Sequence, residues 1–309
     1  MAVGSRLRRL VMTVGFIGIG RMGEPIARRL LQSGQPLVVW SRTPHHADTL
    51  RADGGIVASS SEALLGTCET VLLMLRDEAA IDAVLARGSK TFARLTRDHC
   101  IVQMGTVDPL WSQRFGEDLT AAGARYVEAP VSGSKIPAER GTLLGMLAGA
   151  ESDLERIEML LAPVCQTFIR CGAVPQAMQL KLAVNHYLVG MVCVLSEAVQ
   201  SARRTGIPLA RLASALNLGP MASPVMQTKL QQFVQNDFAA QAAIDDVMHV
   251  AELVLAQAER AGAPSPLMQQ CHEHLVRAHA RGFGQLDMAA VLNHPPALAS
   301  TAVLKPGTP

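Results

Sequence analysis

Residues 13–34, TVGFIGIGRMGEPIARRLLQSG, join a short apolar run to a glycine-rich turn and then to a helical pattern. The apolar run over 13–19 predicts a buried strand. Apolar residues then recur at helical spacing over 23–33, with Pro25 in the first turn and Gly34 after the last. A strand, a glycine turn and a helix in this order predict the first βα unit of a dinucleotide-binding domain.

The turn has the pattern GxGxxG and supplies six predicted cofactor-binding residues: Gly18, Ile19, Gly20, Arg21, Met22 and Gly23. In such a turn the first glycine permits the tight bend, the second lets a pyrophosphate approach the backbone, and the third lets helix and strand pack closely. Free N–H groups and the positive helix end then hold the phosphates. A glycine-rich turn in an unrelated α/β protein is the alternative, but the surrounding βαβ pattern favours the dinucleotide.

Further apolar runs predict more strands of the same sheet. They lie over 37–40, 70–75, 100–104, 124–127 and 143–148, and helical stretches separate them. Strands that alternate with helices indicate βαβ units and a parallel sheet, so the fold class of this half is α/β.

The alternation stops near Gly172. Apolar positions over 177–205 follow helical spacing without a break, which predicts one long helix. The chain after Pro208 also has helical spacing, interrupted at 219–220, 262–266 and 282–284, and the tail from Asn293 holds four prolines and is expected to be loose. We therefore expect a Rossmann domain over 12–175 and an all-α domain over 176–298, joined by the long interdomain helix.

The end of the second predicted strand selects the cofactor. An NAD site places Asp or Glu there to bind the ribose hydroxyls, whereas this chain has Trp40, Ser41, Arg42 and Thr43 and no acid. A carboxylate would repel a 2′-phosphate, but Arg42 can bind it by charge and paired hydrogen bonds, and Ser41 and Thr43 add hydroxyl donors. The pattern predicts NADP(H); an arginine that is merely exposed is the alternative.

Size and composition exclude several other classes of protein. The 309 residues suit two domains, and 49% hydrophobic with 17% charged residues indicate a folded chain. The net charge is only +2, aromatic residues make up 4%, and no long basic run occurs, which argues against nucleic-acid binding.

The cysteines and the first residues of the chain indicate where in the cell the protein is expected. None of the six cysteines forms a CxxC pair, so we expect reduced thiols in the cytoplasm and neither disulfides nor a zinc site. No apolar run reaches the roughly 18 residues of a membrane helix. Residues 1–10 carry three arginines and no acid, which is typical of a short basic extension or, alternatively, of a transit peptide. Translation can also begin at Met12.

His272, His274 and His279 do not share one helix face, so we predict no metal site.

Several motifs in order resemble the β-hydroxyacid dehydrogenase family, which includes 3-hydroxyisobutyrate dehydrogenases and 2-hydroxy-3-oxopropionate reductases. The resemblance covers roughly residues 13–290. It rests on four motifs. The first is the glycine-turn unit (15–34), and the second is Gly105-Thr106, where the family carries Ser-Thr near the nicotinamide ribose. The third is EAPVSGSKIPAERGTLLGMLAG (128–149), which resembles the family's substrate-binding signature, and the fourth is KLAVN (181–185).

The resemblance implies that Lys181 is the catalytic lysine and Asn185 its partner. The chemistry agrees, because reduction of a carbonyl needs a proton at oxygen while hydride reaches carbon, and an ammonium in a dry cleft can supply it. The two residues are four apart and share one helix face. An ordinary solvated helix lysine is the alternative, although the residues flanking Lys181 are apolar.

Further residues are predicted to bind the substrate and the cofactor. The turn Ser132, Gly133 and Ser134 can offer N–H groups and hydroxyls to a substrate carboxylate, together with Lys181 and Asn185. Met74, Leu75, Thr106 and Asp245 complete the predicted cofactor contacts. From the resemblance we expect the second domain to be a substrate and dimerisation domain, with the active site in the cleft between the domains, a small hydroxyacid and its semialdehyde or keto form as substrates, and a homodimer. From composition we expect no nucleic-acid or membrane partner.

The chain departs from the family pattern at several positions. Pro175 and Ala177 replace two glycines before the catalytic helix, Ser134 replaces a glycine, and Asp245 stands where the family has a second lysine, followed by the expected Asp246. Asp245 could pair with Lys181, disfavour an anionic substrate, or face solvent. These departures leave two alternatives: an imine reductase-like enzyme, against which Lys181 argues, and a catalytically silent NADP(H)-binding protein, against which both Lys181 and Asn185 argue.

Overall fold

The structure, a computed structural model, describes residues 13–292. The basic start and the proline-containing tail predicted from sequence lie outside these residues. Contacts divide the described chain into two compact units, one of residues 13–186 and 249–265 and the other of 187–248 and 266–292. The boundary predicted at residue 175 directly precedes helix α9 (Gln176–Arg204), whereas the division by contacts falls inside this helix.

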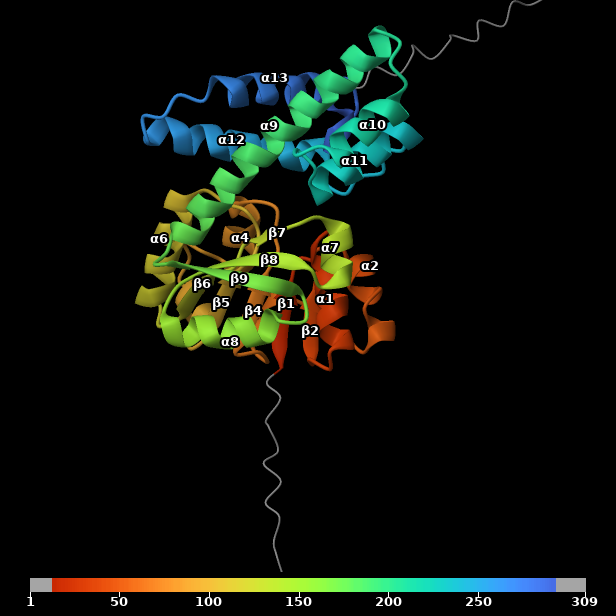
Figure 1. Ribbon diagram of the computed structural model, residues 1–309. Coiled ribbons are helices and arrows are strands. Elements are labelled where there is room, and N and C mark those ends of the chain that lie inside the picture. The colour runs from red at the N-terminus through yellow and green to blue at the C-terminus, as the bar shows by residue number, and fades with distance from the viewer. Residues whose placement is uncertain (1–12, 293–309) are drawn as a thin grey trace, which may run out of the picture. The chain divides into compact units, whose positions relative to one another are not determined.

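The first unit is built on one twisted sheet (Figure 1). Its strands are β1 (Val14–Ile17), β2 (Leu37–Trp40), β3 (Ile56–Val57), β4 (Thr70–Leu73), β5 (Cys100–Gln103), β6 (Arg125–Glu128), β7 (Val131–Ser132), β8 (Leu143–Ala148) and β9 (Cys165–Gly172). Strands β3, β2, β1, β4, β5 and β6 are neighbours in that order and all parallel, followed by β8, which pairs antiparallel with β6 and β7 and parallel with β9. The parallel part has the strand order of dinucleotide-binding domains, so the predicted α/β Rossmann fold is confirmed.

Helices cover both faces of this sheet, since alternate strand residues enter different cores. Phe16 packs in one apolar cluster with side chains of α1 (Gly23–Gln32) and α8 (Glu151–Leu161). Ile17 belongs to a second cluster with side chains of α3 (Ser61–Leu65), α4 (Glu78–Leu85) and α6 (Pro109–Ala121). The helices of this unit are α1 (Gly23–Gln32), α2 (Pro44–Asp48), α3 (Ser61–Leu65), α4 (Glu78–Leu85), α5 (Phe92–Thr96), α6 (Pro109–Ala121), α7 (Lys135–Arg140) and α8 (Glu151–Leu161), with a short 3₁₀ helix at Arg51–Asp53.

The second unit contains helices and no sheet among its described residues. After α9 come α10 (Leu209–Leu218), α11 (Pro224–Gln235), α12 (Ile244–Arg260), α13 (Pro266–Ala280) and a 3₁₀ helix at Met288–Leu292. The predicted all-α second half is thus confirmed, and three of its helix breaks fall where glycine and proline predicted them. By length and composition α9 is apolar enough to cross a membrane, but one such helix is weak evidence, because core helices of soluble proteins pass the same test.

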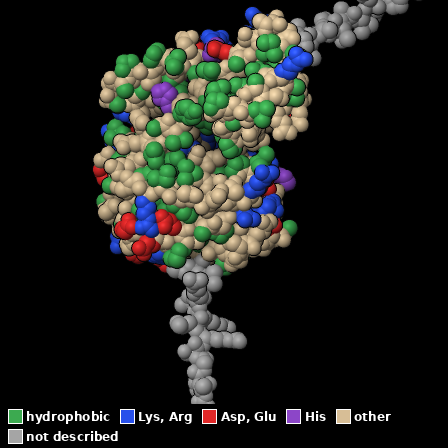
Figure 2. Space-filling model, viewed as in Figure 1, with side chains coloured by type: hydrophobic (Ala, Val, Ile, Leu, Met, Phe, Trp, Pro, Cys, Tyr) green, Lys and Arg blue, Asp and Glu red, His purple; other side chains and the backbone are tan. Residues whose placement is uncertain are grey.

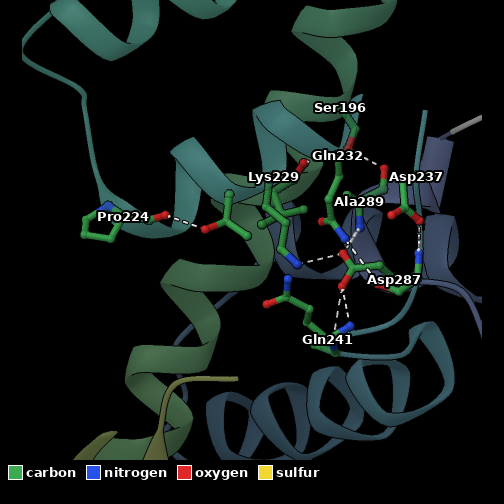
Figure 3. Close-up of polar contacts among 12 residues, drawn as sticks. Ser196, Pro224, Lys229, Gln232, Asp237, Gln241, Asp287 and Ala289 are labelled. Carbon is green, nitrogen blue, oxygen red and sulfur yellow. Dashed lines mark hydrogen bonds and ion pairs between the residues drawn. The ribbon is translucent and has the colours of Figure 1, made fainter. Parts of the chain in front are cut away.

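The break between α11 and α12 was not predicted, because no proline marks it. Asn236 ends α11 in the left-handed conformation, with φ 52°. The Asp287 carboxylate then holds the following segment: it accepts hydrogen bonds from the backbone N–H of Gln241 at 3.0 Å and of Ala242 at 3.2 Å, and pairs with Lys229 Nζ at 2.6 Å (Figure 3). A single buried carboxylate therefore fixes the approach to α12 from more than forty residues away in sequence.

This buried pair leads to a prediction about stability. Asp287 is fully buried and Lys229 nearly so. Replacing Asp287 with alanine leaves a buried ammonium and two half-buried N–H groups without their acceptor, so we expect the free energy of unfolding to fall by about 3–5 kcal/mol. Urea unfolding followed by circular dichroism measures this, with Glu259→Ala, an exposed change on α12, as the control. A loss no larger than that of the control would show that the pair does not hold the segment.

Candidate active site

The glycine turn follows β1 at the point where the strand order of the sheet reverses. Gly18 has φ +103°, and a Cβ there would lie 2.3 Å from the carbonyl oxygen of Met74, so only glycine fits. Its N–H donates to the carbonyl of Trp40 at 3.2 Å. Because β1 lies between β2 and β4, the turn is held between the carboxyl ends of neighbouring strands, where open α/β sheets bind ligands.

The start of α1 offers room for an anion. Gly20 is exposed, and no atom lies within 4 Å of the place its Cβ would take. No side chain of the described residues caps this helix end, whose N-cap is Met22. Gly23 lets the helix approach the strand, since a Cβ there would lie 1.9 Å from the Gly18 carbonyl oxygen. An open backbone at the positive end of a helix fits a dinucleotide pyrophosphate. Of the other predicted turn residues, Ile19 is buried and Arg21 is half-buried.

The segment after β2 carries the predicted phosphate-binding residues. Ser41 is half-buried and accepts a hydrogen bond from the Thr43 N–H at 3.3 Å, whereas Arg42 and Thr43 are exposed. Within residues 13–292 the Arg42 guanidinium forms no hydrogen bond or ion pair, so all its donors are available to an anion. Figure 2 shows basic and histidine side chains gathered over the side of this unit that carries α2, whose first turn adds exposed His45 and His46.

Two further segments lie at the same edge of the sheet, after β4 and β5. Met74, Leu75 and Thr106 are all half-buried there. Gly105 packs against β4, since a Cβ would lie 2.5 Å from the Leu75 carbonyl oxygen. Gln103, which the sequence analysis did not select, is fully buried; its Nε2 donates to the Gly105 carbonyl at 3.2 Å, and no described donor reaches its Oε1.

The predicted substrate turn lies between β7 and α7. Gly133 is exposed and has φ +131°, and a Cβ there would lie 2.5 Å from the Leu143 side chain. Ser132 ends β7, and Ser134 is the N-cap of α7 without bonding that helix through its own hydroxyl. Both serines are half-buried, so their hydroxyls lie near the surface at the start of a helix.

Lys181 and Asn185 lie on α9, one turn apart, and the structure buries both. Only 8% of Lys181 and 5% of Asn185 is exposed. Burial lowers the pKa of Lys181 to about 8. No hydrogen bond or ion pair to Lys181 forms among the described residues, so no carboxylate offsets this effect. The neighbouring Leu180 and Val184 pack against a buried cluster that includes Met146 of β8. Lys181 is therefore desolvated, and no described group accepts a hydrogen bond from its ammonium.

A buried carboxylate holds the helix that carries this lysine. Glu128 ends β6 and is fully buried. Its Oε2 accepts from the N–H of Ala177 at 3.1 Å and of Met178 at 3.2 Å, in the first turn of α9, and its Oε1 accepts from the Ser112 hydroxyl at 2.5 Å. The quoted 128–149 motif contains Glu128, but its role was missed. An acidic residue at the end of an otherwise buried strand is the signal that marks it.

The comparisons with known proteins agree with this geometry. The family model described as the NAD binding domain of 6-phosphogluconate dehydrogenase matches residues 13–172, and the model described as the NAD-binding domain of NADP-dependent 3-hydroxyisobutyrate dehydrogenase matches residues 176–294. The chain belongs to the β-hydroxyacid dehydrogenase family. It is therefore an NAD(P)-dependent oxidoreductase that acts on CH–OH groups.

Individual members of the β-hydroxyacid dehydrogenase family resemble the chain over most of its length. Glyoxylate/succinic semialdehyde reductase 1 of Arabidopsis thaliana is 29% identical over 91% of this chain and 97% of its own. A solved 3-hydroxyisobutyrate dehydrogenase of Salmonella typhimurium has a TM-score of 0.82 at 25% identity, covering 91% of this chain and 99% of its own. An imine reductase of Myxococcus stipitatus shares the fold, with a TM-score of 0.63 at 21% identity over 91% and 98% of the two chains.

Asp245 is the largest departure of this chain from the β-hydroxyacid dehydrogenase pattern, and the structure gives it partners in its own unit. Its carboxylate lies 2.6 Å from His279 Nδ1 and accepts from Gln285 Nε2 at 2.9 Å, and its N–H donates to the Gly284 carbonyl. Asp246 is exposed. Asp245 thus ties the start of α12 to the segment after α13, and its contact with cofactor stays a prediction.

Metal ligands and paired cysteines are not assembled in the described chain. No group of three His, Cys, Asp or Glu side chains is placed to hold a metal over residues 13–292. All six cysteines carry free thiols.

Proposed function

We propose that the protein is an NADP(H)-dependent reductase that interconverts a small semialdehyde or keto acid with its hydroxyacid, with Lys181 as the general acid. The observation that carries this proposal is the buried, unpaired ammonium of Lys181 on the first turns of α9. An ammonium in apolar surroundings stabilises charge that develops on a carbonyl oxygen and can give it a proton. Asn185, on the same helix face, would orient the substrate hydroxyl or carbonyl.

The cofactor would be held by the glycine turn and by the segment after β2. Gly18 permits the tight turn, and Gly20 leaves the backbone open beside α1. The unpaired Arg42 offers a charged, planar guanidinium to a 2′-phosphate. The nicotinamide ring supplies or accepts the hydride. The site residues then have to bind and orient the substrate, exclude water and move one proton, and Ser132 and Ser134 are proposed to receive the substrate carboxylate.

The relatives support a substrate class for the proposed reaction. Semialdehyde and 3-hydroxyisobutyrate names among them support a small oxo or hydroxy acid. Steady-state NADPH oxidation with succinic semialdehyde, glyoxylate, a 2-keto acid and a cyclic imine tests this. Turnover of an aldehyde is expected. Turnover of the imine alone would favour the imine reductase alternative, and tight NADPH binding without any turnover would favour the catalytically silent one.

The lowered pKa of Lys181 gives a prediction for pH dependence. The protonated lysine is the donor in the reductive direction, and its pKa is about 8. The kcat for aldehyde reduction should therefore fall as pH rises through about 8, while kcat for alcohol oxidation should rise over the same range. Initial rates in both directions between pH 6 and 10, taken at saturating substrate, measure this. A reductive rate that is flat across about pH 8 would contradict the role of Lys181.

We also propose a cytoplasmic homodimer. Tyr187 and Val194, on one side of α9, are 75% and 63% exposed, and Ala183 and Ala198 are exposed on the same helix. Large exposed apolar side chains at helical spacing are typical of a protein interface. The six free thiols support a reducing compartment.

A further inference from the structure

The first turn of α9 depends on a side chain from another element. The Gln176 N–H bonds the Ala173 carbonyl and the Gln179 N–H bonds the Pro175 carbonyl, which leaves the N–H groups of Ala177 and Met178 between them. Glu128 accepts both with one carboxylate oxygen. Ala177 and Met178 are fully buried, so water does not replace this acceptor. A negative charge is also favourable beside the positive end of a long helix.

The Glu128 carboxylate is itself fixed from the opposite side. Its other oxygen accepts from Ser112 of α6, and the Ser112 hydroxyl lies 2.7 Å from the Tyr126 hydroxyl. When Ser112 donates to Glu128, Tyr126 can donate to Ser112, so a chain of donors ends at the carboxylate. The geometry thus connects β6, α6 and the start of α9 through one buried group.

We propose that Glu128 is a positioning residue of the reaction, which holds the first turn of α9 and thereby fixes Lys181 against the reacting carbonyl. Lys181 follows Ala177 by four residues, so it lies one helical turn from the bonds that Glu128 makes. Direct charge interaction is not the route, since burial is the one cause of the lowered pKa of Lys181. This inference rests on the proposed role of Lys181.

The ionisation of Glu128 should be visible in the rate. Burial raises the pKa of Glu128 to about 7, although the bonds from Ser112, Met178 and Ala177 favour its charged form. The other titratable groups facing it are Tyr126, whose pKa burial raises well above its usual value, and Cys171, whose pKa is also raised by burial. Both stay neutral near pH 7. Below about pH 7 a protonated Glu128 is a weaker acceptor for the helix N–H groups, so kcat should fall toward acid pH.

The test compares Glu128→Ala and Glu128→Gln with the wild type in the NADPH-linked reduction of succinic semialdehyde. Alanine removes the acceptor, and we expect kcat to fall on the order of tenfold or more, as misplacement of a catalytic group does. Glutamine keeps an oxygen for the two N–H groups, and its amide can donate to Ser112. Glu128→Gln should restore kcat at pH 8. Its pH–rate profile should lose the decrease in kcat below about pH 7 (the acid limb) and keep the decrease above about pH 8 that Lys181 causes.

A second readout does not need turnover. Hydrogen-exchange protection of the Ala177 and Met178 amides should be lost in Glu128→Ala and kept in Glu128→Gln. The proposal would be overturned if kcat of Glu128→Gln still fell below about pH 7, or if a folded Glu128→Ala had the kcat of the wild type. If Glu128→Ala does not fold, the pH profile of Glu128→Gln alone decides. Lys181→Ala, assayed in parallel, separates the two claims: its retained turnover would refute the proposed function, whereas its inactivity with normal Glu128 variants would refute only the role of Glu128.

Discussion

Lys181→Ala is expected to lower kcat for aldehyde reduction by a factor on the order of 100 or more, because it removes the group that protonates the carbonyl oxygen. The ammonium is buried and no described side chain pairs with it, so the folded protein does not need it as an ion-pair partner. Alanine at this position relieves the burial of a charge, and the fold should tolerate it. The NADPH dissociation constant should stay near the wild-type value, since the glycine turn and Arg42 are untouched.

The control for this variant is another lysine of the same unit. Lys90 is exposed and forms no hydrogen bond or ion pair within the described range, so Lys90→Ala should keep full activity. Steady-state rates give kcat and KM, and fluorescence titration gives the affinity for NADPH. A Lys181→Ala variant that turns over at nearly the rate of Lys90→Ala would remove the lysine from the mechanism.

Arg42→Asp is expected to reverse the choice of cofactor. The guanidinium would lose its charge-assisted bonds to the 2′-phosphate, and a carboxylate would repel that phosphate while accepting bonds from the ribose hydroxyls of NADH. Bonds of this kind contribute about 1.5–3 kcal/mol, so kcat/KM for NADPH should fall by roughly one to two orders of magnitude relative to NADH. Because Arg42 is exposed, the change should leave stability near that of the wild type.

A matched charge reversal elsewhere controls for the net charge of the protein. Arg114 on α6 is exposed, and Arg114→Asp changes the charge by the same amount. The ratio of kcat/KM for NADPH and NADH is measured for each variant at constant ionic strength. An unchanged ratio in Arg42→Asp, equal to that of Arg114→Asp, would mean that Arg42 does not contact the 2′-phosphate.

Local sequence patterns predicted most of the sheet, because a strand buried on both faces is a continuous apolar run. Strands β1, β2, β4, β5, β6 and β8 all lie within a residue or two of their predicted ranges. Strand β9 was not predicted, since most of Cys165–Gly172 is exposed or half-exposed and has neither a continuous apolar run nor a strict alternation of polar and apolar residues. The short strands β3 and β7 have two residues each and carry no periodic signal.

Some features of the site are likewise determined by local sequence, whereas others depend on contacts between residues far apart in the chain. The glycine turn is encoded in six consecutive residues, and the spacing of Lys181 and Asn185 places them on one helix face. In contrast, the link from Glu128 to Ala177 spans 49 residues, and the link from Asp287 to Gln241 spans 46. Contacts of this range depend on the finished fold, so neither the anchor of α9 nor the break before α12 was predicted. The burial that lowers the pKa of Lys181 likewise arises from tertiary packing.

The pKa of Lys181 can be observed directly, since the chain has only five lysines: Lys90, Lys135, Lys181, Lys229 and Lys305. Reductive methylation with ¹³C-formaldehyde gives each a separate NMR signal whose shift follows its protonation. We expect one lysine signal that titrates near pH 8 and is absent from Lys181→Met. A spectrum in which no lysine signal titrates near pH 8 would contradict the claim that a buried, unpaired ammonium on α9 drives the reaction.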